Sequence, residues 1–217
     1  TGMGLERIAA VLQGVHDNYD TDTFKTLIAA SEDKVGKALT AESRASHRVI
    51  ADHLRSSGFL VADGVLPANE GRGYVLRRIM RRAIRYGRSI GLDRPFLHET
   101  VQTVFGIMDE AYPELKDASA FILNVVKNEE AKFLETLDTG MKLLEATIDD
   151  VMAEKAAKER ARIPGAVIFK LYDTFGFPVD IIADHVKNME IDLDMDGFHR
   201  AMEEQKTRSR STRKFTG

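Results

Sequence analysis

The feature that most constrains the fold is a proline-free stretch, from about Ser119 to Arg162, in which apolar residues return every three to four positions. This spacing places them along one side of an α-helix. We expect either one very long helix or two helices joined near Gly140, ended by Pro164-Gly165. The recurring residues are Ile122, Val126, Phe133, Leu137, Met141, Leu144, Ile148 and Val151.

Shorter helical patterns occupy most of the first half of the chain. Helices are expected at about residues 4–13, 23–30 and 41–56. The segment FLVADGVLPANEGRG, residues 59–73, breaks the helical period with several glycines and a proline. It is therefore expected to form an ordered loop, or a short hairpin at most.

The last third of the chain predicts a compact helical unit. The stretch 166–186 predicts a short apolar helix, a turn and a second helix. Asp194 or Asp196 is expected to cap a final helix that runs into a basic, frayed end at 206–217. The predicted fold class is therefore mainly α, a helix bundle with long helices.

Composition narrows the class of protein further. The chain has 217 residues, of which 43% are hydrophobic and 30% charged, enough for a core in one large domain or two small ones. We expect a cytoplasmic protein, because no apolar run approaches the roughly 20 residues of a membrane span and no signal peptide is recognisable. The absence of cysteine excludes disulfides, thiolate zinc sites and cysteine nucleophiles. The histidines are scattered, so no metal site is predicted.

One short segment concentrates positive charge in a chain whose net charge is −3. RGYVLRRIMRRAIRYGR, residues 72–88, contains seven arginines and no acid, and apolar pairs alternate with arginine pairs. On a helix this order gives one apolar face and one cationic face, whose guanidiniums suit phosphate oxygens. Internal salt bridges or a solvated face are the alternative interpretation. The candidate phosphate-binding residues are Arg72, Arg77, Arg78, Arg81, Arg82 and Arg85.

The chain contains three blocks of sequence, in this order: HRVIADHLRSSGFLVADG, LPANEGRGYVLRRIMRRAIRYGR and FKLYDTFGFPVDIIADHV. In content and in order, these blocks resemble the tRNA-recognition region of alanyl-tRNA synthetases. At the N-terminus, TGMGLER looks like the third signature motif of class II synthetases. By this resemblance Arg7 contacts ATP, and Gly2, Gly4 and Glu6 shape the turn beside it.

The resemblance implies a division of the chain and a role as part of a larger enzyme. Residues 1–16 would end the class II catalytic core, and residues 17–217 would form the helical tRNA-recognition domain. The family's first two motifs, alanine pocket and zinc-binding editing domain are not found in this sequence, so aminoacylation by this chain alone is not expected. The whole enzyme would use ATP and Mg²⁺, its zinc site would lie outside this chain, and its other domains would be partners.

The resemblance also implies how RNA is recognised. The acceptor stem of alanine tRNA carries a G·U pair, which leaves the guanine 2-amino group unpaired in the minor groove and displaces the uracil carbonyls. A reader needs an acceptor for the amine and a donor for a carbonyl, and the minor groove of A-form RNA is open to protein side chains. Asn69 and Asp173 match the residues that the family uses in this way. On local grounds, both are explained more simply by hydrogen bonds within a turn or at a helix end. A helical protein-interaction module, with its arginine face turned to an acidic partner, is the alternative function.

Overall fold

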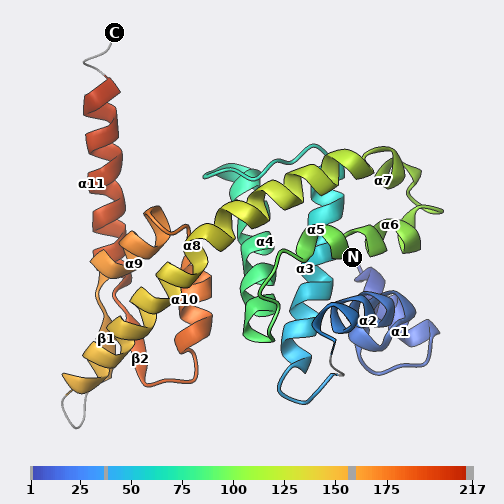
Figure 1. Ribbon diagram of the computed structural model, residues 1–217, viewed down its shortest axis with the longest axis horizontal. Coiled ribbons are helices and arrows are strands. Elements are labelled where there is room, and N and C mark those ends of the chain that lie inside the picture. Colours follow the sequence, from blue (N-terminus) through green and yellow to red (C-terminus); the bar gives the residue numbers. More distant parts are fainter. Residues whose placement is uncertain (1, 37–38, 156–159, 214–217) are drawn as a thin grey trace. The chain divides into compact units, whose positions relative to one another are not determined.

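The computed structural model describes residues 2–36, 39–155 and 160–213, without the side chains of residues 206 and 208–213. The chain divides into two compact units, Thr1–Lys132 and Phe133–Gly217. Nearly all regular structure is helical, so the predicted mainly α class is confirmed (Figure 1). No helix within the described ranges is both long enough and apolar enough to cross a lipid bilayer.

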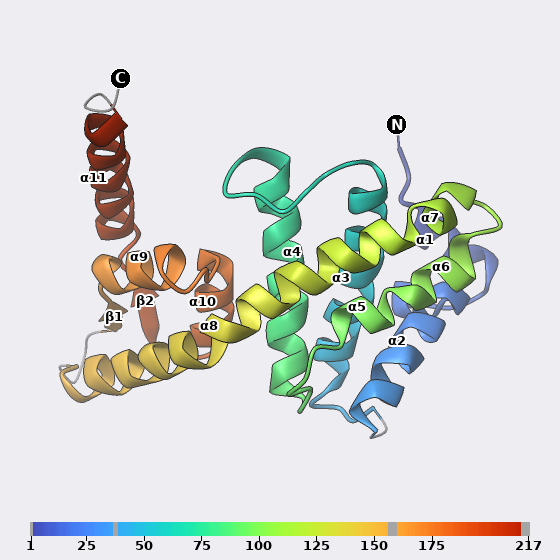
Figure 2. The ribbon, with the colours of Figure 1, turned by 45° about the horizontal axis from the view of Figure 1, so that its top comes forward.

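The regular structure of the first unit, as far as its residues are described, is helical only. Its two long central helices are α3 and α4, which pack along each other. Around them lie shorter helices and the first part of α8, as Figure 2 shows. The elements are α1 (Leu5–Leu12), the 3-10 helix η1 (Asn18–Asp20), α2 (Asp22–Val35), α3 (Arg44–Ala62), α4 (Gly71–Ser89), α5 (Leu97–Thr100), α6 (Gln102–Met108), α7 (Pro113–Asp117) and α8 (Ser119–Ala153).

The contact between α3 and α4 forms much of the core of this unit. Ile50 and Leu54 of α3 and Leu76 and Met80 of α4 are all fully buried. Burying a side chain of this size is worth about 1.5–3 kcal/mol relative to leaving it exposed. The apolar face predicted for the arginine-rich segment is therefore confirmed for Leu76, Met80, Ala83 and Ile84, whereas Val75 is exposed.

Helix α3 is longer than the sequence predicted. It continues to Ala62, so the prediction that residues 59–62 already break the helix is wrong. The reason is that Val61 still belongs to the buried face of α3, at 1% exposure. Residues 63–70 then form a loop without a strand, so the hairpin alternative is also wrong.

The long apolar pattern forms one helix rather than two. Helix α8 runs without a break through Gly140, where an added Cβ would lie 2.4 Å from Cε2 of Phe177. Gly140 therefore leaves room for a buried phenyl ring instead of ending the helix. The predicted end at Arg162 is wrong, because α8 ends at Ala153 and residues 161–163 form a strand; residues 156–159 lie outside the described residues.

The second unit continues from α8 with two short parallel strands and three helices. Strand β1 (Ala161–Ile163) pairs with β2 (Ile191–Leu193). Between them lie α9 (Gly165–Asp173) and α10 (Val179–Val186), which confirms the predicted helix, turn and helix. Helix α11 (Met195–Arg213) follows β2, and residues 214–217 of the basic end lie outside the described residues.

Asp194, and not Asp196, caps the last helix. Asp194 Oδ1 accepts a hydrogen bond from the Gly197 backbone N–H at 3.0 Å, and Oδ2 accepts one from the Gly165 N–H at 3.2 Å. One carboxylate thus serves the first turns of both α9 and α11. The two helices approach closely here, since a Cβ on Gly165 would lie 2.3 Å from the carbonyl carbon of Gly197.

Asp194 is expected to make the stability of the second unit depend on pH in the acid range. The backbone N–H groups of Gly197 and Gly165 hold the pKa of the Asp194 carboxyl below its usual range. The pKa of an aspartate in the unfolded chain is about 3.9. A carboxyl whose pKa is lower in the folded protein stabilises the fold at pH values above about 3.9, and this stabilisation is lost as the pH falls through the pKa of the folded state. Asp194→Asn should therefore lose less thermal stability between pH 6 and pH 3 than the wild type, measured by circular dichroism.

The matched control for this experiment is Asp196→Asn, which removes the same charge at an exposed position two residues further along the chain. Its pH profile should follow that of the wild type. Identical pH profiles for all three proteins would contradict a role for Asp194 in acid unfolding.

Candidate nucleic-acid interface

The loop of residues 63–70 is fixed against α4 by a glycine. A Cβ on Gly73 would lie 2.3 Å from the carbonyl oxygen of Leu66 and 2.6 Å from Cβ of Ala68. Only a residue without a side chain lets the loop pass so close to the first turn of α4. The close approach places Asn69, which is exposed, next to the arginines of α4.

Part of the arginine face of α4 is turned toward a buried acid. Arg77 Nε lies 3.2 Å from Glu129 Oε1, and Arg81 donates to the same oxygen from Nε at 2.7 Å and Nη2 at 2.6 Å. The Glu129 side chain is only 4% exposed and comes from α8. Burial lowers the pKa of Arg81, and the charge of Glu129 opposes this effect. The salt-bridge interpretation therefore describes Arg77 and Arg81.

The other arginines of α4 have different surroundings. The guanidiniums of Arg82 and Arg85 lie 5.9 and 5.1 Å from the ring centroid of Tyr86. Within the part of the chain that the structure describes, no group makes a hydrogen bond or ion pair with Arg72 or Arg78. Arg72 is exposed and Arg78 is half-buried. These two are the arginines best placed to meet an external anion.

Asn69 makes a tertiary contact rather than a local one. Its Oδ1 accepts a hydrogen bond from Nη1 of Arg77, which lies eight residues further along the chain. Arg77 thus contacts both Asn69 and Glu129. This contact differs from the hydrogen bond within a turn that the local sequence alone suggests for Asn69.

Asp173 lies in the second unit and ends α9. Its Oδ1 accepts a hydrogen bond from Nε2 of Gln205 on α11 at 2.7 Å, and the residue is exposed. The second carboxylate oxygen, Oδ2, accepts no hydrogen bond from any other described residue. The turn that follows is held by Thr136 of α8, whose hydroxyl donates to the carbonyl oxygen of Phe175 at 2.8 Å.

The residues of the N-terminal motif lie at the start of α1. Gly4 occupies the N-cap position, and Gly2 and Arg7 are exposed. Glu6 accepts a hydrogen bond from Arg55 of α3; its own backbone N–H, more than Arg55, keeps the pKa of Glu6 below the usual value. No described residue forms a hydrogen bond or ion pair with Arg7, so its guanidinium is available to an anion.

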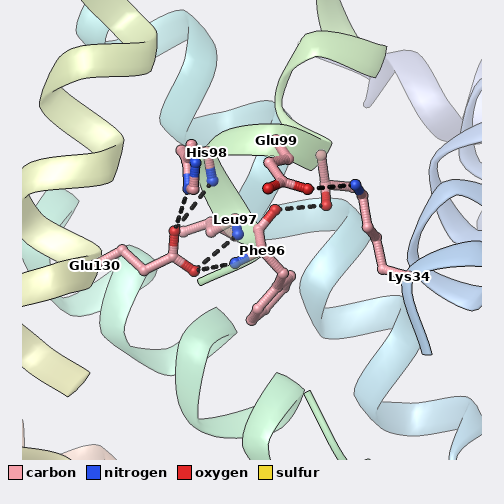
Figure 3. Close-up of polar contacts among 7 residues, drawn as sticks. Lys34, Phe96, Leu97, His98, Glu99 and Glu130 are labelled. Carbon is pink, nitrogen blue, oxygen red and sulfur yellow. Dashed lines mark hydrogen bonds and ion pairs between the residues drawn. The ribbon is translucent and has the colours of Figure 1, made fainter. Parts of the chain in front are cut away.

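Two buried acids of α8 were missed by the reading of the sequence. Glu130, which is completely buried, accepts hydrogen bonds from the backbone N–H groups of Phe96 and Leu97 at 2.7 and 2.8 Å, and from His98 Nδ1 at 2.9 Å (Figure 3). It thereby caps the start of α5, while its neighbour Glu129 faces α4. A signal was present, because the apolar recurrence skips these positions between Val126 and Phe133.

Substituting Gly73 is expected to disturb Asn69 through the loop. Gly73→Ala forces the backbone of Leu66 and Ala68 away from α4, and overpacking of this kind costs about 1–3 kcal/mol. We expect a lower urea midpoint and weaker binding of any ligand that Asn69 contacts. Gly106→Ala in α6, where no atom lies within 4 Å of the added Cβ, should instead stabilise by about 0.5–1 kcal/mol. Equal effects of the two substitutions would contradict the role of Gly73.

Metal ligands do not cluster in the described residues. No group of three or more histidine, aspartate and glutamate side chains in ranges 2–36, 39–155 and 160–213 is arranged to bind a metal ion. The candidate site therefore rests on arginines, an amide and carboxylates.

Comparison with known proteins places the chain in a family. The sequence model described as "tRNA synthetases class II (A)" matches residues 1–217. The chain is 56% identical over its full length to proteins named alanine–tRNA ligase from Desulfosudis oleivorans and Rhizorhabdus wittichii, and 50% identical over 99% of its length to the one from Neisseria meningitidis. It spans 24% of each of these relatives. The chain therefore belongs to the class II (A) tRNA synthetase family, and the resemblance to alanyl-tRNA synthetases is confirmed.

Proposed function

We propose that this chain is the part of an alanine–tRNA ligase that binds the acceptor stem of tRNA(Ala) and reads its G·U pair. The observation that carries this proposal is the exposed Asn69, whose side chain is held by Arg77. Two further arginines of the same helix, Arg72 and Arg78, form no ion pair with any acid of the described chain. The identity of 50–56% with alanine–tRNA ligases supports the choice of RNA. Attachment of alanine to tRNA is proposed for the whole enzyme, because the relatives are about four times as long as this chain.

The chemistry of the two predicted reading residues fits a G·U pair. The Asn69 amide supplies N–H donors, which suit a uracil carbonyl, while the free oxygen of Asp173 suits the unpaired guanine amine. Both side chains are exposed. The wide minor groove of A-form RNA gives such side chains access to base edges.

The arginines would bind the phosphates and position the stem. Arg78→Ala is expected to weaken binding to all RNA helices alike and to lower the slope of log K against log salt by about 1. Arg81→Ala should change that slope less, because Glu129 already neutralises Arg81. The measurement is fluorescence anisotropy at several salt concentrations; a larger slope change for Arg81→Ala than for Arg78→Ala would contradict this assignment.

Gly2, Gly4, Glu6 and Arg7 are proposed to form part of the ATP site of the whole enzyme. The residues present fit such a role, because the exposed Arg7 guanidinium has no internal partner and Gly4 gives an extended entry to α1. An arginine of this kind binds phosphate oxygens of a nucleotide. In this proposal Glu6 orients the helix through Arg55 and does not contact the nucleotide.

The experiment that tests the proposal is a titration of the 217-residue chain with two acceptor-stem minihelices, one with the G·U pair and one with G·C, at low and moderate salt. Tighter binding of the G·U helix, weakening as salt rises, is the expected result. Equal affinity for both helices would overturn G·U reading. Failure to bind either helix would overturn the RNA interface altogether and leave an acidic protein as the partner of the arginine face.

A further inference from the structure

Glu129 is a buried carboxylate whose contacts converge on one oxygen. Oε1 lies within 3.2 Å of both Arg77 and Arg81, and the side chain is 4% exposed. A carboxylate at this depth is strongly destabilising unless cations and hydrogen bonds compensate for the lost water. The mutual attraction therefore fixes the two guanidiniums as firmly as it fixes the acid.

The Arg77 guanidinium, held by Glu129, decides which atom of Asn69 faces outward. A guanidinium has five N–H donors and no acceptor, so the amide must turn its oxygen toward Arg77. Oδ1 is the atom in contact with Arg77 Nη1. The Nδ2 group, which makes no hydrogen bond with any described residue, is left as the atom free for an external partner.

We propose that Glu129 is a positioning residue for base reading: through Arg77 it keeps the Asn69 amide oriented with its N–H donors toward the RNA. This inference rests on the proposed function. An amide that can turn by 180° presents a carbonyl oxygen as often as a donor, and two facing acceptors repel. Glu129 therefore sets the donor character of Asn69 without touching RNA.

Loss of Glu129 has two opposite effects on binding. Glu129→Gln removes the negative charge that compensates Arg77 and Arg81, so binding of any RNA helix through its phosphates should stay equal or become tighter. The ion pair that fixes Arg77 is weakened at the same time, so Arg77 orients the Asn69 amide less firmly and the preference for G·U should fall. A variant that merely damaged the fold would weaken binding to both helices instead.

The test uses the 217-residue chain and the same two minihelices. Glu129→Gln should lower the ratio of the G·C to the G·U dissociation constant by about threefold to tenfold, without weakening binding of the G·C helix. Glu135→Gln is the matched control, because it makes the same charge change at an exposed position of α8. In an Asn69→Ala background, Glu129→Gln should leave the ratio unchanged, since the positioned amide is gone.

A second readout does not depend on RNA. In the ¹⁵N–¹H spectrum, the side-chain NH₂ signals of Asn69 should be dispersed in the wild type and should move toward the random-coil position in Glu129→Gln, while Glu135→Gln leaves them in place. Asn69→Asp provides a further check, because an aspartate still pairs with Arg77 but offers RNA an acceptor only. It should fold normally and lose the G·U preference.

The outcomes separate the two proposals. A wild-type chain that binds both helices equally would overturn the proposed function, and the NH₂ signals would still decide whether Glu129 orients Asn69. A wild-type chain that prefers G·U, combined with a Glu129→Gln variant that keeps both the preference and the Asn69 signals, would overturn the positioning role alone. The positioning role would also be overturned if Glu129→Gln lowered the ratio of the G·C to the G·U dissociation constant equally in the wild-type and the Asn69→Ala background.

Discussion

Glu130→Ala is expected to lower the free energy of unfolding by about 3–5 kcal/mol, the largest effect of any single substitution considered. The substitution removes the acceptor of the Phe96 and Leu97 backbone N–H groups and of the His98 ring, all at a fully buried position (Figure 3). These donors are then left without a partner, and each unsatisfied buried group costs about 1–3 kcal/mol. The measurement is urea unfolding followed by circular dichroism.

Two further variants give this experiment its control. Glu130→Gln keeps one carbonyl oxygen for the N–H groups and should cost less than Glu130→Ala. Glu135→Ala, at an exposed position on the same helix, should change stability by no more than about 0.5 kcal/mol. A loss for Glu130→Ala as small as that for Glu135→Ala would show that the cap on α5 does not stabilise the fold.

Asp173→Asn is expected to reduce the preference for the G·U minihelix about tenfold to 100-fold, since a hydrogen bond to a charged group is worth about 1.5–3 kcal/mol. The reason is chemical: the carboxylate oxygen left free by Gln205 can only accept, whereas an amide can present an N–H group to the guanine amine. Affinity for the G·C helix should hardly change. Anisotropy titrations with both helices measure the two affinities.

Asp196→Asn serves as the control for Asp173→Asn because it removes an exposed carboxylate from the same unit of the chain. It should leave both affinities unchanged. Equal losses on the G·U and G·C helices for Asp173→Asn would assign Asp173 a general role in binding and not a role in reading the base pair.

The apolar face of α4 could be predicted because the pattern is local. Leu76, Met80 and Ile84 recur at the spacing of one helix face, and all three are buried. The finer detail depends on geometry: neighbours on a helix are about 100° apart, so the two residues of an apolar pair need not be buried equally. Val75 accordingly is 42% exposed while Leu76 is buried.

The partners of the arginines could not be predicted from the same pattern. Arg81 and Glu129 are separated by 48 residues, and which acid meets which arginine depends on how α4 and α8 pack. The gap in the apolar recurrence of α8 marks Glu129 and Glu130 as inward-facing, but it does not say what they face. A buried ion pair requires three-dimensional information because both partners look like surface residues in sequence.

The two short strands were missed for a related reason. Three residues, as in Ala161–Ile163, are too few to show the alternation of a strand. Their pairing is also a long-range event, since Ala161 aligns with Ile191 across α9 and α10. The position of the turn between those helices could be predicted, because Gly176 and Pro178 act locally.

The shared cap at Asp194 links Gly165 and Gly197, which are 32 residues apart in sequence. Because one carboxylate accepts from both Gly165 and Gly197, neither helix start can detach without disturbing the other. Amide hydrogens exchange with solvent when the local structure that holds their acceptor opens, and such openings involve contiguous cooperative units. We therefore expect the beginnings of α9 and α11 to open and close together in amide hydrogen exchange, although they are far apart in the sequence.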